Sequence, residues 1–195
     1  MTDIGIVAGS AAFESNATYS PFAQVCSHWA SLRQQGAVPR RAQIDPQAMA
    51  QALPDVFLAQ IVAPRVARLR LCGHRIEDLM GMDMRGMPLS VLCQGDAREA
   101  LAEALEQVAL GARVILSLQG EEGFGLPPLQ ARLALMPLAD EAGRITRILG
   151  VFERDGEPGR TPRRFALAKP LALPDAAPQP VRKPPVLRVI TGGRG

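Results

Sequence analysis

The stretch richest in side chains that could bind a metal is residues 72–93, CGHRIEDLMGMDMRGMPLSVLC. It holds one histidine, two cysteines and four methionines. A closed zinc site needs about four ligands at defined spacings. His74 has only Cys72 close to it in sequence, while Cys93 lies further along and Cys26 far earlier, which matches no standard spacing. We therefore expect no metal site, and the sequence identifies no cofactor.

Groups that could carry catalysis are equally sparse. Ser90 and Ser117 lack the sequence context of an activated nucleophile, and only two histidines exist to act as a base. The acidic pair Glu121-Glu122 falls in an expected loop, where solvated carboxylates are the ordinary explanation. We therefore expect a protein that is not an enzyme.

Two arginines are candidates for holding an anionic ligand. Arg132 lies between apolar residues in an expected strand, and Arg85 lies in an expected turn. A guanidinium group offers a planar fork of donors that suits carboxylate or phosphate oxygens. The alternative is that each arginine faces solvent or pairs with a carboxylate of its own chain.

The apolar periodicity predicts an α+β fold built on a five-stranded antiparallel sheet with helices on one side. A helix at 20–35 carries Phe22 and Trp29 on its apolar face, and needs a surface to pack on, either its own sheet or a second copy of the chain. A short helical face with Met49 follows, between Pro46 and Pro54. A long helix is expected at 96–112. The expected strands are 56–62, 66–72, 113–119, 129–138 and 144–154.

Short motifs accompany this order of elements. A short helix ends in Leu79-Met80-Gly81, and further motifs lie at Trp29 to Arg33, Pro39 to Arg41, Ile44 to Pro46, Leu53 to Leu58 and Asp83 to Ser90. The element order resembles that of a PAS domain. Over about residues 20–154, the motifs resemble a small stand-alone PAS family of alphaproteobacterial proteins, formerly a domain of unknown function.

This resemblance implies a regulatory module with a ligand pocket between the sheet and its helical side. The side chains that would line it are His74, Met80, Met84, Arg85, Met87 and Arg132. The alternative is that the methionines are ordinary core, because unbranched apolar side chains fill gaps. Oxygen-sensing PAS domains carry their iron-binding histidine on the long helix, and 96–112 has none. The flavin-binding motif also fails to match Leu92 to Gly95.

Charge and proline content divide the chain into three parts. Residues 155–195 hold eight Lys/Arg against three acids, a net charge of +5, whereas residues 1–154 carry −2. We expect a flexible N-terminus at 1–17, a PAS-like domain at 18–155 and a proline-rich basic tail at 156–195. Within the tail, VLRVI at 186–190 could add to a sheet edge. Three cysteines, the lack of a signal-peptide pattern and the lack of a membrane-length apolar run favour the cytoplasm.

These observations favour a non-enzymatic sensory or regulatory module that acts through a protein partner and is gated by a small ligand. A homodimer through the helix at 20–35 fits the same evidence. One alternative is a small-molecule or cofactor-binding protein or enzyme that uses the methionine-lined pocket. Another is an adaptor that binds nucleic acid or a membrane surface through the basic tail, although the sequence carries no strong signal for either.

Overall fold

The computed structural model describes residues 6–8, 19–33 and 36–168 of the 195-residue chain. In chain order the elements are β1 (Ile6–Ala8), α1 (Pro21–Ser31), η1 (Arg41–Gln43), η2 (Gln47–Asp55), β2 (Val56–Ala63), β3 (Val66–Cys72), α2 (His74–Met80), η3 (Leu89–Leu92), α3 (Asp96–Ala109), β4 (Val114–Gly120), β5 (Gln130–Ala139), β6 (Ile145–Asp155) and β7 (Phe165–Leu167). Within these described ranges no helix has both the length and the apolar character that crossing a membrane requires.

The five expected strands are all present as an antiparallel set, and their bounds lie within one residue of those expected. The sheet has the order β1-β4-β5-β6-β2-β3, and β7 also pairs with β4. Within the described residues it therefore has seven strands rather than five. β1 pairs with β4 in parallel and β7 pairs with it antiparallel. The α+β class is as predicted, with two short strands added.

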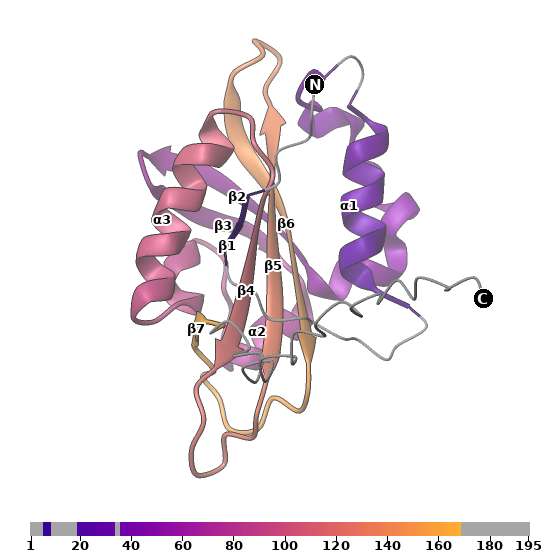
Figure 1. Ribbon diagram of the computed structural model, residues 1–195. Helices are drawn as coiled ribbons and strands as arrows, with labels where there is room; N and C mark the ends of the chain where they lie inside the picture. The colour runs from indigo at the N-terminus through magenta and orange to yellow at the C-terminus, as the bar shows by residue number, and fades with distance from the viewer. Residues whose placement is uncertain (1–5, 9–18, 34–35, 169–195) are drawn as a thin grey trace, which may run out of the picture.

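The sheet separates two apolar cores, because successive side chains of a strand point to opposite faces. Figure 1 shows α3 on one side of the sheet and α1 on the other. The first core packs under α2, η3 and α3, and includes Phe57, Leu69, Met80, Met84, Leu133 and Phe152. The second core packs under α1 and η2, and includes Val25, Trp29, Met49, Met136, Leu149 and Val151.

The compact fold extends beyond residue 155, where the domain was expected to end. Phe165 of β7 is fully buried in the first core, with its ring 4.9 Å from that of Phe152. The N-terminal segment expected to be flexible contributes β1, and the VLRVI segment lies outside the described residues. A lone phenylalanine among prolines and arginines carries no periodicity, so the sequence pattern gave no reason to expect β7.

Arg163 fixes this extension to the loop between β4 and β5. Its side chain is fully buried and donates hydrogen bonds to the carbonyl oxygens of Pro158 (2.6 Å), Glu121 (3.0 Å) and Pro127 (2.9 Å). Its backbone N–H also donates to the carbonyl of Leu79 in α2 (2.8 Å). Arg163 therefore ties its own segment to the β4–β5 loop through its guanidinium group and to α2 through its backbone N–H.

A close contact sits at the centre of the sheet, between β2 and β6. Gly150 lies opposite Phe57 in the paired strands. A Cβ at position 150 would lie 2.0 Å from Cζ of the Phe57 ring, so the aromatic ring covers the bare glycine backbone.

Candidate functional site

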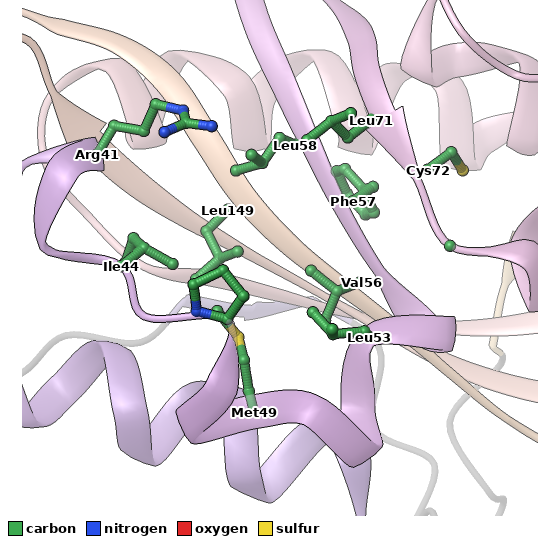
Figure 2. A pocket seen from close by; sticks show the side chains of 12 residues that line it. Arg41, Ile44, Met49, Leu53, Val56, Phe57, Leu58, Leu71, Cys72 and Leu149 are labelled. Atoms are coloured by element: carbon green, nitrogen blue, oxygen red, sulfur yellow. The ribbon is translucent and has the colours of Figure 1, made fainter.

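The pocket that we take as the candidate site lies between η2 and the strands β2, β3 and β6, and has a volume of about 250 Å³. We call it the η2 pocket. Figure 2 shows Met49 and Leu53 of η2 on one side, Val56 and Leu58 of β2 across from them, and Arg41 reaching from η1 toward Leu58. Its full lining is Arg41, Ile44, Pro46, Met49, Leu53, Val56, Phe57, Leu58, Leu71, Cys72, Gly73 and Leu149.

Local sequence explains why η2 stands over the sheet as a 3₁₀ segment. Pro46 caps its start, Oδ1 of Asp45 accepts a hydrogen bond from the N–H of Gln47 (2.9 Å), and Met49 departs from helical geometry with φ −130°. Gly73 then permits the close approach at the other end, since a Cβ there would lie 2.2 Å from the carbonyl oxygen of Pro54. A side chain at 73 would force η2 away from β3.

Polar contacts tie η2 to the helices on both sides. Asp55, at its end, is buried and forms an ion pair with Arg75 of α2 at 2.8 Å. Burial raises the pKa of the Asp55 carboxyl, while the charge of Arg75 acts in the opposite direction. On the other side, Nε2 of Gln24 in α1 donates to the carbonyl of Ala48 (3.1 Å). A displacement of η2 would therefore be felt at α1 and α2.

The chemistry of this lining suits binding. Its ionisable side chains are Arg41, which is exposed at the rim, and Cys72. Burial raises the pKa of the Cys72 thiol to about 12, with a smaller contribution from Glu77, so the thiol is protonated at neutral pH. A protonated thiol is a poor nucleophile and a poor metal ligand. The pocket thus offers an apolar cavity with one cation at its mouth.

The residues predicted to line a ligand pocket do not line the η2 pocket. Met80 and Met84 are buried in the first core, whereas His74 and Arg85 are exposed on the surface. Met87 is half-buried, and its carbonyl accepts the N–H of Leu69 (2.9 Å). No group of three or more His, Cys, Asp or Glu side chains in the described part of the chain is arranged to hold a metal. A ligand site at these residues stays a prediction.

Arg132, the last of the six predicted pocket residues, lies on the face of the sheet that α1 covers, opposite the first core. Its Nε donates to Oε2 of the buried Glu153 (2.7 Å), and its guanidinium lies 4.3 Å from the centre of the Phe22 ring. The hydroxyl of Ser20 donates to Oε1 of the same Glu153 (2.7 Å). Arg132 therefore anchors the start of α1 to the sheet.

Trp29 lies at the centre of that helix interface. Its side chain is fully buried in the second core, so α1 packs on its own sheet. A homodimer through this helix would have to use its remaining surface, and it stays a prediction.

The residues of the η2 pocket were missed in the sequence because they lie in three separate stretches. Met49 was recognised as part of an apolar face, with Pro46 and Pro54 as its bounds. What the sequence could not show is that this face only partly meets the strands, which leaves space beside Leu58 and Leu71. The exposed fraction of Leu71 is 55%, a large apolar side chain open to solvent at the pocket wall.

Comparison with known proteins gives a family match. A family model described as "PAS domain" matches residues 17–153. No curated protein matches the chain.

Several solved structures match part of the chain, each with a TM-score below 0.5. The light-state structure of the blue-light photoreceptor Aureochrome1 LOV is 18% identical, covers 57% of this chain and 88% of its own, and has a TM-score of 0.42. An RNA-binding light-oxygen-voltage receptor is 21% identical over 63% of this chain and 37% of its own, with a TM-score of 0.43. The Rhodobacter sphaeroides LOV protein is 17% identical over 69% of each chain, with a TM-score of 0.40.

Proposed function

The chain belongs to the PAS domain family, a family of sensory modules, and from this premise we propose that it is a regulatory module without catalytic activity. A small, mainly apolar molecule binds in the η2 pocket and changes how α1 packs on the sheet. The altered α1 surface then changes the affinity for a protein partner. The three cysteines are all free thiols, which supports a role in the reducing cytoplasm.

The position of Met49, shared between the pocket and the second core, is the main support for this proposal. It lines the η2 pocket and is also a buried member of the second core, together with Val25 and Trp29 of α1. A molecule that enters the pocket must contact Met49, whose unbranched side chain changes rotamer easily. Because cores are close-packed, a shift of Met49 requires its neighbours on α1 to adjust.

The size of the pocket limits the ligand. Sites for drug-sized molecules span about 300–1,000 Å³, and the η2 pocket, at about 250 Å³, lies below that range. Its apolar walls favour a short hydrocarbon chain or a small ring.

Trp29 allows a direct test, because it is the only tryptophan of the chain and lies in the core that Met49 shares. We expect titration with 1-octanol to change Trp29 fluorescence in a saturable way and to increase hydrogen exchange of the α1 amides. Leu58→Phe fills the pocket and should abolish both effects. Leu110→Phe is the matched control, since Leu110 has an exposed fraction of 80% at the end of α3.

The outcome that would reject the proposal is equally direct. Saturable binding that Leu58→Phe and Leu110→Phe affect alike would place the ligand elsewhere. Binding without any change in the exchange of α1 would remove the link from pocket to helix.

A further inference from the structure

A second pocket adjoins the η2 pocket and shares Arg41 with it. It has a volume of about 230 Å³ and is lined by Arg40, Arg41, Ala42, Ala139, Asp140, Glu141 and Arg147. We call it the arginine pocket. Leu149 lines the η2 pocket and Arg147 lines the arginine pocket, two residues apart on β6. Side chains at that spacing share one face of a strand, about 7 Å apart. The two pockets are therefore neighbours on one face of the sheet.

The charges of the arginine pocket are unbalanced. Asp140 is already engaged, since its carboxylate accepts the N–H groups of Ala142 (3.0 Å) and Arg144 (2.9 Å) and pairs with the Arg144 guanidinium (3.1 Å). The hydrogen bond from the Arg144 backbone is the largest cause that holds the pKa of the Asp140 carboxyl below its usual range. Asp140 therefore stays charged and satisfied without the lining arginines.

What remains is three guanidinium groups against the exposed carboxylate of Glu141. Among the described residues, no carboxylate lies within ion-pair distance of Arg40, Arg41 or Arg147. The uncompensated charge of the pocket is thus about +2. A phosphate monoester carries about −1.5 to −2 at pH 7 and three acceptor oxygens, and planar guanidinium forks match such oxygens. A carboxylate would neutralise only half of this charge.

We propose that the two pockets form one groove for an amphiphile that carries a phosphate monoester on a short apolar chain. The chain lies in the η2 pocket against Leu149, and the phosphate lies among Arg40, Arg41 and Arg147. This inference rests on the proposed function, because it names the chemical class of the molecule that the η2 pocket takes.

The test compares four probes by calorimetry, with the two charged amphiphiles kept below their micelle-forming concentrations and 1-octanol kept below its solubility limit. The probes are octyl phosphate, octanoate, 1-octanol and inorganic phosphate. We expect octyl phosphate to bind at least tenfold more tightly than 1-octanol, with octanoate between them and inorganic phosphate weakest. Arg147→Gln should weaken octyl phosphate about tenfold and leave 1-octanol unchanged. The control is Arg164→Gln, an exposed arginine beside β7, which should change neither.

The outcomes separate this inference from the function on which it rests. If 1-octanol binds and octyl phosphate binds no tighter, the phosphate site is wrong while the regulatory pocket stands. If neither binds, both are wrong. Inorganic phosphate that binds as tightly as octyl phosphate would also overturn the groove, because the chain would add nothing.

A final arm separates two sources of the phosphate. Vesicles that contain phosphatidic acid present the same monoester at a membrane surface. Sedimentation of the protein with these vesicles, lost in Arg147→Gln, would support the site and assign the phosphate to a lipid headgroup. Binding of free octyl phosphate without sedimentation would support the site and assign it to a dissolved amphiphile.

Discussion

The indole nitrogen of Trp29 donates a hydrogen bond of 3.0 Å to the carbonyl oxygen of Pro137, so α1 is fastened to the backbone of β5 in the middle of a buried core. Proline contributes no N–H to a sheet. The carbonyl oxygen of Pro137 is nevertheless available as an acceptor, and the indole N–H of Trp29 in α1 bonds to it. The contact fixes both the depth and the orientation of α1.

Replacement of Trp29 measures this contact. Trp29→Phe keeps an aromatic ring but leaves the carbonyl of Pro137 without its donor, and should lower the free energy of unfolding by about 1–3 kcal/mol. Trp29→Ala removes the ring as well and should cost about 3–5 kcal/mol. Urea unfolding followed by circular dichroism gives both values. Phe124→Ala, at a side chain with an exposed fraction of 96%, should stay within about 0.5 kcal/mol of wild type. A Trp29→Phe variant as stable as wild type would contradict the role of the hydrogen bond.

The ion pair beneath α1 makes a prediction about the buried carboxylate. Arg132→Met leaves Glu153, whose exposed fraction is 5%, without its cation, and should destabilise the fold by about 3 kcal/mol. The double variant Arg132→Met/Glu153→Leu removes both charges and should recover most of that loss. Thermal or urea unfolding of the two variants decides the matter. A double variant no more stable than Arg132→Met would show that the loss does not come from leaving Glu153 buried without its cation.

The three thiols should react slowly with iodoacetamide. Burial raises the pKa of Cys26 to about 11 and those of Cys72 and Cys93 to about 12. Because only the thiolate attacks, labelling should accelerate about tenfold for each pH unit up to those values. Cys72 is half-buried, whereas Cys26 and Cys93 are buried, so Cys72 should be labelled first. Mass spectrometry of peptides after timed labelling measures the order, and 1-octanol should protect Cys72 alone. Prior labelling of Cys93 would show that the first core opens more readily than the pocket.

The same thiols predict how stability depends on alkaline pH. Their folded-state pKa values lie above the value of about 8.5 for a free cysteine, so the folded chain holds these protons more tightly than the unfolded chain does. Their contribution to stability is complete below about pH 8 and is lost as the pH rises toward 11 and 12. Cys93→Ala should show a shallower loss of stability than wild type between pH 8 and 10, as measured by urea midpoints.

Arg163 should be among the most sensitive positions of the chain. Arg163→Met leaves three carbonyl oxygens without their donor, and should cost about 3–5 kcal/mol. The Arg163 side chain holds the loop between β4 and β5 in place in wild type. In the variant this loop should become open to proteolysis near Phe124. Limited chymotrypsin digestion, with Arg164→Met as the neighbouring control, reports this. Equal cleavage of both variants would show that the loop is held by other contacts.

The central strands could be predicted because each carries a regular alternation and ends at a clear turn. The loop 139–143 illustrates this, since Asp140 and Arg144 close it with a hydrogen bond from the Asp140 N–H to the Arg144 carbonyl (2.9 Å). The start of the long helix is different. The carboxylate of Asp96 accepts the N–H of Leu167 in β7 (3.3 Å), and Gly95 forms the helix cap without a side-chain hydrogen bond. A local pattern cannot show that a strand from elsewhere in the chain will take the acceptor.

The candidate site could be predicted only in part, because its cavity depends on long-range contacts. The distance between η2 and the sheet depends on the close approach of Gly73 to Pro54. The arginine pocket depends on η1 lying beside the turn between β5 and β6. Neither contact follows from periodicity. Of the methionines that drew attention in the sequence, Met80 and Met84 pack in the first core.

The contact between Phe57 and Gly150 carries a consequence for how this sequence can vary among its relatives. With an aromatic ring at 57, even an alanine at 150 would overlap it, so the two positions must change together or not at all. A relative with a side chain at 150 should carry a small residue at 57, and its neighbours in the first core should be larger to fill the space. Position 57 also borders the η2 pocket, so such an exchange would reshape the cavity and alter which molecules the descendant protein can recognise.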